Sequence, residues 1–220
     1  MQFLYDPNAG QKQLYIEGEN YRYLFKVRRF KKGENVLLRN LKDSFAYRYK
    51  IVGIDRRRAE AVLVEKEASV LQPKRHLHLI WCIIDMKVVE KTLPMLNQIG
   101  VSKITFVYCE RSQKNFRPDF ARFEKILINS CQQCGRTDLM QLETMMSLDE
   151  VTERYGAFAV LDFGGSLQYE EISAVLIGCE GGFTEAELEK LASYRKIGLD
   201  TDYILKSETA AVSIAAKLLI

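Results

Sequence analysis

The chain has 220 residues, which is enough for one large domain or two small ones. It holds no run of about twenty apolar residues, and its first ten residues lack both a basic start and an apolar core. These features argue against a membrane-spanning helix and a secretion signal, and they favour a cytoplasmic protein. The five cysteines are odd in number and widely spread, which predicts reduced thiols.

The formal net charge of +3 is unevenly distributed along the chain. Residues 1–72 contain 15 Lys and Arg against 9 Asp and Glu, whereas residues 73–220 contain 17 against 20. A basic first third followed by a mildly acidic remainder is typical of a phosphate-contacting module joined to a separate catalytic module.

The first seventy residues alternate short apolar runs with charged turns, a pattern that predicts a small β-barrel. Strands are expected at residues 14–16, 36–39, 45–54 and 61–64, with a short helix or turn over residues 20–30. Residues 67–74 contain Pro73 and have no clear period, so the linker is placed there. The expected domains are therefore residues 1–70 and 74–220.

One segment of the predicted barrel interleaves cations with the aromatic residues Tyr21, Tyr23 and Phe30. Such a mixture suits RNA, because cations meet phosphates while aromatic rings stack on splayed bases. A solvated charged surface is the alternative. The candidate RNA-binding cations are Arg22, Lys26, Arg28, Arg29, Lys31 and Lys32.

From residue 75 onward, predicted strands alternate with predicted helices, which indicates a parallel α/β domain. Strands are expected at residues 78–85, 101–108, 157–162 and 174–177, and helices at residues 87–99 and 119–134. Cys131 and Cys134 form a C-x-x-C, but no second Cys or His pair lies nearby. Both fall on the apolar stripe of the second helix, so core packing is favoured over zinc or redox chemistry.

Two loops near the end of the chain carry the candidate binding site. The first follows the strand at 174–177 and contains Gly178, Gly181 and Gly182, which allow the backbone to approach a flat ligand closely. Thr184 and Glu187 form a predicted capping box for the next helix. The second loop, residues 199–208, is expected to enter a final helix through Ser207 as its cap. Ordinary βα turns are the alternative for both loops.

The two loops resemble those of a known family. The chain reads Ile177-Gly178-Cys179-Glu180-Gly181-Gly182-Phe183 and then Ile204-Leu205-Lys206-Ser207-Glu208-Thr209-Ala210. In order and spacing these segments are similar to the I-G-P-E-G-G-F and I-L-R-T-E-T-A segments of SPOUT-class methyltransferases, and within that class of the small-subunit (16S) ribosomal RNA uridine-N3 methyltransferases. Cys109-Glu110-Arg111-Ser112 and Gln133-Cys134-Gly135-Arg136-Thr137 match two further family segments. The chain departs from the pattern at Cys179, Lys206 and Asp200.

The resemblance implies a PUA-like β-barrel followed by a SPOUT α/β domain with a C-terminal trefoil knot. It further implies S-adenosylmethionine as cofactor, ribosomal RNA or the small ribosomal subunit as partner, no metal, and a homodimer with its interface on residues 210–220. The implied cofactor-binding residues are Leu161, Ile177, Gly178, Cys179, Glu180, Gly181, Gly182, Leu199, Ile204, Leu205, Ser207 and Thr209.

The resemblance also suggests roles in the reaction. Arg111 and Lys206 are expected as cations near the uracil oxygens, and Glu208 as a base or as an organiser of that pair. Glu208 equally fits a role in stabilising the positive end of its helix. Arg136, just past a predicted helix end, is expected either to hold an RNA phosphate or to cap carbonyl groups.

Two other functions remain open at this stage. The first is a SPOUT methyltransferase that acts on another RNA position. The second is a non-catalytic RNA-binding factor of ribosome assembly, which the departures at Cys179, Lys206 and Asp200 would support. No G-x-G-x-x-G or P-loop motif is present, so Rossmann and P-loop enzymes lose their best support.

Overall fold

The computed structural model describes residues 2–68, 71 and 73–220, which form two compact units. The first unit comprises Met1–Gln72 and Ile128–Leu139, and the second comprises Pro73–Leu127 and Met140–Ile220. Helix α3 (Phe120–Cys134) therefore contributes to both units. The contribution of this second segment to the first unit was not predicted. Within the expected linker, residues 69–70 and 72 lie outside the described residues.

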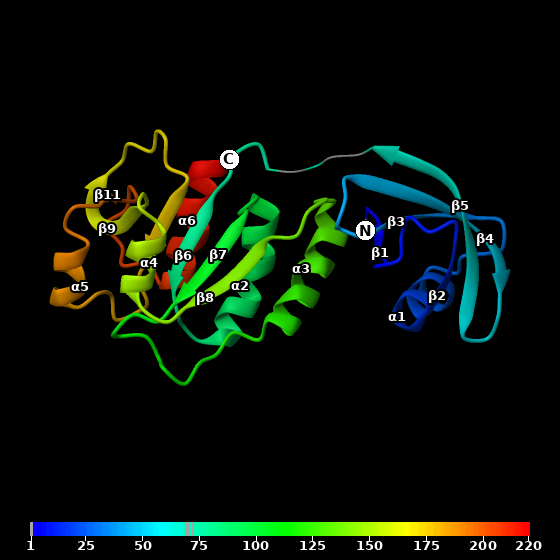
Figure 1. The fold of residues 1–220 in the computed structure, drawn as a ribbon, viewed down its shortest axis with the longest axis horizontal. Coiled ribbons are helices and arrows are strands. Elements are labelled where there is room, and N and C mark those ends of the chain that lie inside the picture. Colours follow the sequence, from blue (N-terminus) through cyan, green and yellow to red (C-terminus); the bar gives the residue numbers. More distant parts are fainter. Residues whose placement is uncertain (1, 69–70, 72) are drawn as a thin grey trace. The chain divides into compact units, whose positions relative to one another are not determined.

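The first unit is built on a five-stranded sheet in the order β1-β3-β4-β5-β2 (Figure 1). Its elements are β1 (Leu4–Tyr5), β2 (Gln13–Glu17), α1 (Gly18–Tyr21), the π-helix η1 (Arg22–Val27), β3 (Asn35–Arg39), β4 (Phe45–Ile54) and β5 (Arg58–Ala68). Strand β1 pairs parallel to β3, and the other pairs are antiparallel. All predicted strands of this region are present, and the two-residue β1 was missed.

The hydroxyl of Tyr49 has specific hydrogen-bond partners inside the first unit. The fully buried Tyr49 donates its hydroxyl to the Gln11 carbonyl at 2.7 Å and accepts from the Gly10 amide at 2.8 Å. The end of α3 packs on the same unit, where Cys131 joins an apolar cluster with Phe3 and Leu41. Core packing of Cys131, as the helical stripe predicted, is therefore confirmed.

The second unit holds a six-stranded, entirely parallel sheet in the order β11-β9-β10-β6-β7-β8. Its strands are β6 (His78–Cys82), β7 (Lys103–Val107), β8 (Gln141–Met145), β9 (Ala159–Ser166), β10 (Ala174–Ile177) and β11 (Arg195–Ile197). Besides α3, its helices are α2 (Met86–Ile99), α4 (Leu148–Arg154), α5 (Glu185–Lys190) and α6 (Ser207–Leu219). The predicted parallel α/β domain is confirmed, whereas β8, α4 and β11 were not predicted.

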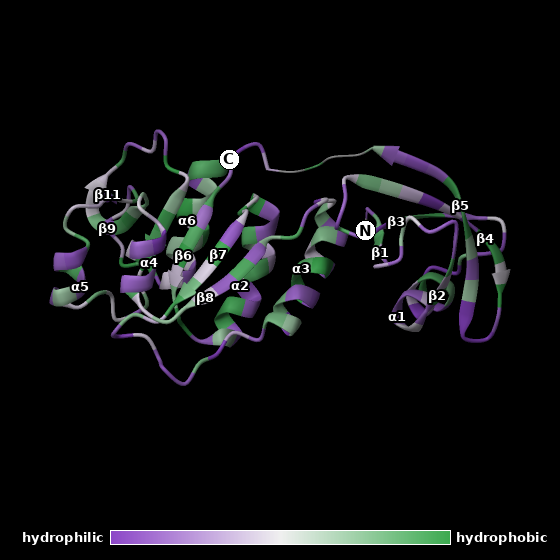
Figure 2. Ribbon diagram, in the orientation of Figure 1, coloured by the Kyte–Doolittle hydropathy of each residue, from purple (hydrophilic) through white to green (hydrophobic). Residues whose placement is uncertain are grey.

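Burial explains why these segments form their elements. Every residue of β6 is buried, as expected for a central strand covered on both faces. Helix α2 alternates apolar and polar residues around its circumference (Figure 2) and packs against α6. It ends at Gly100, whose φ of 109° is the left-handed conformation that favours glycine at a helix end. In the described part of the chain, no helix is long and apolar enough to cross a bilayer.

A buried polar chain links three neighbouring strands of this sheet. His78 Nε2 lies 2.7 Å from Thr105 Oγ1, which donates to Glu143 Oε1 at 2.7 Å. Lys103 pairs with the same carboxylate at 3.0 Å, and Tyr155 donates its hydroxyl to it. Burial, together with the charge of Lys103, lowers the pKa of His78 to about 4. Burial raises the pKa of Glu143, but the hydrogen bonds from Thr105, Tyr155 and Lys103 prevail and bring it to about 2.

We expect this chain of buried groups to make the fold sensitive to acid. His78 stays neutral in the folded state down to about pH 4, but in the unfolded state it binds a proton near pH 6.5. Its contribution to the free energy of unfolding is therefore complete above pH 6.5 and is lost as the pH falls towards about 4. Glu143 adds a further loss from about pH 4.5 down to about 2. Urea titrations between pH 7.5 and 4.5 should show the free energy of unfolding falling by up to about 1.4 kcal/mol per pH unit from His78 alone.

Two variants isolate the His78 term. His78→Phe removes the buried titrating group. The slope of the free energy of unfolding against pH should therefore become shallower between pH 6.5 and 4.5, even if the substitution also changes the stability at pH 7.5. His76 is exposed, and its charge is the smallest of the causes that lower the pKa of His78, so His76→Phe should change the slope far less than His78→Phe does. Equal slopes in wild type and His78→Phe would show that His78 does not cause the loss of stability in this pH range.

Candidate cofactor and RNA-binding site

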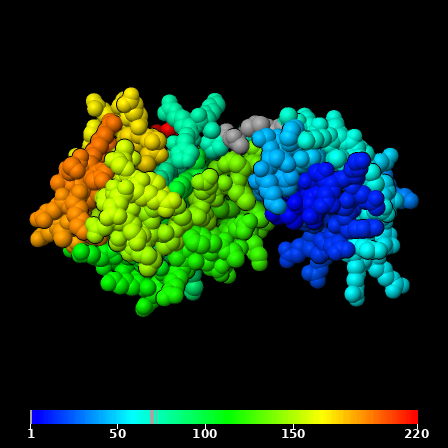
Figure 3. All heavy atoms as spheres, viewed as in Figure 1, coloured from blue at the N-terminus to red at the C-terminus, as the bar shows by residue number. Residues whose placement is uncertain are grey.

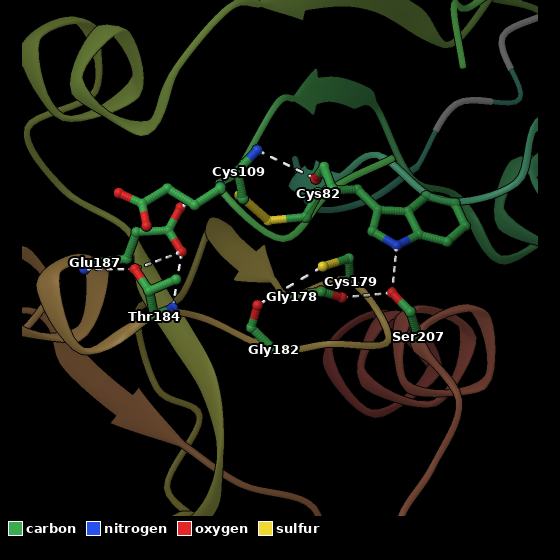
Figure 4. The surroundings of a disulfide bond; sticks show 11 residues. Cys82, Cys109, Gly178, Cys179, Gly182, Thr184, Glu187 and Ser207 are labelled. Carbon is green, nitrogen blue, oxygen red and sulfur yellow. Dashed lines mark hydrogen bonds between the residues drawn. A yellow bond between two sulfur atoms is a disulfide. The ribbon is translucent and has the colours of Figure 1, made fainter. Parts of the chain in front are cut away.

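The first predicted loop leaves the carboxyl end of β10 and leads into α5. The predicted capping box is confirmed: Thr184 Oγ1 accepts from the Glu187 amide at 3.3 Å, and the Glu187 carboxylate accepts from the Thr184 amide at 2.9 Å. Glu187 is only 3% exposed and also accepts from the Glu110 amide at 2.8 Å. The carboxylate therefore ties the start of α5 to the segment that follows β7 (Figure 4).

Ser207 joins the second loop to the first. Its hydroxyl donates to the Gly178 carbonyl at 2.5 Å and accepts from the indole N–H of the fully buried Trp81 at 2.8 Å (Figure 4). Ser207 is the first residue of α6 rather than its cap, which is Lys206 and makes no side-chain capping bond. The predicted capping role was therefore wrong, because the hydroxyl is engaged in these long-range contacts.

Both loops line one cavity of about 300 Å³. Ten of the twelve predicted cofactor residues line it, namely Leu161, Ile177, Gly178, Cys179, Glu180, Gly182, Leu199, Ile204, Leu205 and Ser207. The lining also includes Asp162, Phe163, Phe183, Leu188, Thr201, Tyr203 and Ala210, which were not predicted. Phe183 and Ala210 stand inside the matched segments, and Asp162 and Phe163 lie towards the carboxyl end of a predicted strand, where ligands of α/β sheets bind.

The cavity suits a ligand with a flat apolar part and polar edges. Its walls combine aliphatic side chains such as Leu161 and Leu205 with the backbone of the glycine loop. Gly182 has a φ of 65°, and a Cβ there would meet no atom within 4 Å. Cys179, in place of the family's proline, holds the turn by donating its Sγ–H to the Gly182 carbonyl at 3.6 Å.

The other predicted residues of this region border the cavity without lining it. Gly181 and Thr209 are not among its lining residues, and neither are Arg111, Lys206 and Glu208. The exposed Arg111 packs along Gly181 and donates from Nη1 to the Gly181 carbonyl at 2.8 Å. Lys206 and Glu208 flank Ser207 at the start of α6. Within residues 73–220 no ion pair connects Arg111, Lys206 and Glu208.

A disulfide lies beside the glycine loop and corrects one prediction. Cys82 at the end of β6 and Cys109 just after β7 are bonded to each other, so reduced thiols were the wrong expectation for this pair (Figure 4). The two strands are in-register neighbours, with Cys82 opposite Val107, which brings their carboxyl ends together. The sequence separation of 27 residues gave no sign of this proximity.

The predicted RNA-binding cations of the first unit are all exposed, on η1 and on the turn before β3. The aromatic residues between them were expected to offer their rings to RNA bases, but they pack inward to different degrees. Tyr21 is 5% exposed and donates its hydroxyl to the Asp55 carbonyl, while Tyr23 and Phe30 pack against the core. The ring of Tyr21 is therefore committed to the core of the unit, whereas Tyr23 and Phe30 are half-buried and the cations are exposed.

Arg136 also departs from the expectation of a phosphate contact. It is 5% exposed, and its guanidinium meets the Asp138 carboxylate through Nε at 3.2 Å and Nη2 at 2.8 Å. A bidentate pair of this kind fixes both groups in the turn after α3. Arg136 therefore stabilises this turn through its pairing with Asp138.

Comparisons with known proteins identify the family of the chain. Residues 71–219 match the model of an RNA methyltransferase domain, and residues 16–64 match that of an RNA methyltransferase PUA domain. The ribosomal RNA small subunit methyltransferase E of Helicobacter pylori (strain ATCC 700392 / 26695) is 41% identical over 98% of both chains, and its namesake from Aquifex aeolicus is 24% identical over 99% of this chain and 98% of its own.

A solved structure shares the fold. The ribosomal RNA small subunit methyltransferase E from Neisseria gonorrhoeae, bound to S-adenosyl methionine, superimposes with a TM-score of 0.79 at 22% identity, over 98% of this chain and 95% of its own. The predicted PUA-like first domain and the resemblance stated from the two loops are confirmed by these matches. The chain belongs to the family of ribosomal RNA small subunit methyltransferases E.

Proposed function

We propose that this protein transfers a methyl group from S-adenosylmethionine to N3 of a uridine in small-subunit ribosomal RNA. The observation that carries the proposal is the single cavity lined by both family loops at the carboxyl ends of β9 and β10. The relative at 41% identity is named a small-subunit ribosomal RNA methyltransferase, and the solved relative holds S-adenosyl methionine.

The residues present fit this cofactor. Leu161, Ile177, Leu199 and Leu205 supply apolar walls for the adenine, and the backbone of Gly178–Gly182 offers N–H and C=O groups to its edge. When bound, S-adenosylmethionine supplies an electrophilic methyl group on a sulfonium. The protein's task is to hold the uridine in line with that methyl group and to make its N3 nucleophilic.

Uracil N3 carries a proton at neutral pH and attacks only once that proton has left. Arg111 is placed to help because, in the part of the chain that the structure describes, one of its five N–H donors is engaged, with the Gly181 carbonyl. The remaining donors can stabilise the negative charge that develops on the uracil oxygens. Lys206 is the second candidate cation, and Glu208 is the candidate base.

Two finer features belong to the proposal. We infer that the C-terminal segment is threaded as a trefoil knot, as the family resemblance implies; the bonds from Ser207 to Trp81 and Gly178 place the start of α6 beside β6 and the glycine loop. We also infer a cytoplasmic homodimer. Helix α6 buries Ala211, Ile214, Ala215 and Leu218 within its own unit, and the half-buried Val212, Ala216 and Leu219 are the part of the predicted interface that a second copy could cover. Exposed Phe163, Tyr203 and Ile204 at the cavity are further candidates.

The RNA-binding role of the first unit rests on its exposed cations. None of Arg22, Lys26, Arg28, Arg29, Lys31 and Lys32 has an acidic partner within 4.0 Å in the described part of the chain. Unpaired surface cations can neutralise phosphates without first breaking an ion pair. We propose that they dock the ribosomal RNA.

The proposal is tested by cofactor titration and by mapping the product. Calorimetry should show saturable binding of S-adenosylmethionine to the wild type. Incubation with small-subunit RNA or small subunits that lack the modification should then yield N3-methyluridine in digested RNA, identified by mass spectrometry. Thr201→Trp places a bulky ring in the cavity and should abolish cofactor binding. Thr201→Ser keeps the hydroxyl that accepts from the Tyr203 amide and should bind normally.

The outcomes separate the candidate functions. Methylation at another atom or base would replace the uridine-N3 assignment with another RNA methyltransferase. No cofactor binding, even with RNA present, would favour a non-catalytic assembly factor.

A further inference from the structure

A second and larger cavity lies in the same unit, at the carboxyl ends of β7 and β8. It measures about 700 Å³, and its walls come from the segment after β7, from the β8–α4 connection and from α5. Its lining residues include Tyr108, Lys114, Arg117, Met146 and Lys190. Figure 3 shows α5 in orange next to the yellow-green α4 region, and Lys190 pairs with Asp149 across them at 2.6 Å. No residue assigned to the cofactor cavity lines this one.

The charges of this cavity are only partly neutralised by one another. The Lys190–Asp149 pair is satisfied, and the Glu187 carboxylate is occupied by the Thr184 and Glu110 amides. Lys114 and Arg117 are exposed, and within residues 73–220 neither has an ion-pair partner. Two cations at the rim are therefore available to an anion, while the carboxylates in the wall disfavour a bare polyphosphate.

The interior suits a neutral flat group with a polar edge. Tyr108, Met146 and Leu148 give it apolar surface. The hydroxyl oxygen of Thr144, another lining residue, is shielded from solvent and has no hydrogen-bond partner among the described residues. A buried hydroxyl without a partner costs on the order of 1–3 kcal/mol, so a ligand that supplies one is favoured.

This cavity is coupled to the cofactor loop by direct contacts. Glu187 lines it and at the same time caps the helix that follows the glycine loop. Arg111, next to the lining residue Glu110, holds the Gly181 carbonyl of that loop. The glycine loop therefore separates a ligand in this cavity from the cofactor cavity.

We propose that this cavity receives an RNA nucleotide adjacent in the strand to the one that is methylated. Its base enters between Tyr108 and Met146, and a neighbouring phosphate binds Lys114 and Arg117. The inference rests on the proposed function, and it adds a second contact site for the same RNA. A base held here helps to keep the target nucleotide out of its stack, since an unstacked strand is what single-stranded RNA recognition requires.

The test compares two pairs of charge removals. Lys114→Ala/Arg117→Ala removes the two rim cations, and Lys91→Ala/Lys125→Ala removes two exposed cations of α2 and α3 that line neither cavity. Binding of small-subunit RNA is measured by filter retention over a salt series, together with methylation kinetics. For the rim pair we expect a KM for RNA at least fivefold higher and a slope of log K against log salt smaller by about 0.7, since one neutralised single-strand phosphate contributes about that much. Cofactor affinity should not change.

A second pair of variants tests the interior without altering charge. Met146 is 67% exposed at the cavity, so Met146→Trp fills the space at little risk to folding, whereas Met146→Ala enlarges it. Met146→Trp should raise the KM for RNA at least fivefold, and Met146→Ala should raise it less.

The inference is overturned if the rim pair matches the control pair in salt slope, or if Met146→Trp binds RNA like the wild type, whether or not the protein methylates. A lowered slope in a protein that methylates nothing would uphold the RNA site and reject the proposed reaction. The two failures are therefore distinguishable.

Discussion

Gly165→Ala should lower the free energy of unfolding by about 3 kcal/mol, because the new methyl group has no room beside β11. An ideal Cβ at Gly165 would lie 2.3 Å from the Ile197 carbonyl carbon and 2.6 Å from its oxygen. These are backbone atoms of the neighbouring strand, so no side-chain rotation can relieve the overlap. The strands must separate where the Gly198 amide bonds the Ser166 carbonyl at 3.0 Å.

The same substitution should weaken cofactor binding. Gly198 directly precedes Leu199, which lines the cofactor cavity, and its carbonyl accepts from the Tyr169 hydroxyl at 2.9 Å. A backbone shift at Gly198 therefore moves one wall of that cavity. We expect the dissociation constant for S-adenosylmethionine to rise by at least tenfold in calorimetry.

Gly156→Ala is the matched control. A Cβ at Gly156 would meet no atom within 4 Å, and the residue does not have a positive φ. The control should melt within a degree or two of the wild type, since the substitution only restricts the unfolded chain. A Gly165→Ala protein as stable as Gly156→Ala would show that β9 and β11 are not held at this separation.

The parts of the fold that could be predicted are those whose signal is local. The capping box of Thr184 and Glu187, the glycine at the end of α2 and the apolar run of β10 are each contained in a few consecutive residues. Strands β1 and β11 have two and three residues, too few for a periodicity to be detected. In β8, Glu143 is drawn into the sheet by Thr105, Lys103 and Tyr155, so its residues do not form an apolar run.

The parts that could not be predicted depend on contacts between distant residues. Arg136 follows a helix and therefore suggests a capping or phosphate-binding cation, but its pairing with Asp138 and its burial depend on how the turn packs. The Cys82–Cys109 bond requires knowing that β6 and β7 are neighbours in register. The cavity at the ends of β7 and β8 combines three separate segments, and no single stretch of the sequence indicates that they meet.

Ser207 shows how a local pattern can indicate the wrong contact. A serine before a helical run predicts a cap, yet its hydroxyl bonds Trp81 and Gly178, which lie 126 and 29 residues away in the chain. The position is therefore a link between the two family loops and the central strand β6. Its removal should affect both stability and the cofactor cavity.

Ser207→Ala should destabilise the fold by about 3 kcal/mol, because it leaves the indole N–H of a fully buried Trp81 and the Gly178 carbonyl without a partner. The glycine loop loses its tether to α6, so the affinity for S-adenosylmethionine should fall by at least fivefold. Thermal melts and calorimetric titrations measure the two effects. Ser213→Ala, on the same helix, is the control; no hydrogen bond of the Ser213 side chain is found in the described part of the chain, and alanine favours helix, so its stability should not decrease.

A double-mutant cycle with Trp81→Phe separates the lost hydrogen bond from other effects of the substitution. Phenylalanine has no N–H, so in this background Ser207→Ala no longer leaves a buried donor unpaired, and its cost should fall by about 1–2 kcal/mol. The effect on cofactor affinity should persist, because the Gly178 carbonyl still loses its donor. Equal costs in the two backgrounds would show that the contact between Trp81 and Ser207 does not contribute to stability. An unchanged cofactor affinity in Ser207→Ala would show that the glycine loop keeps its shape without the bond to Gly178.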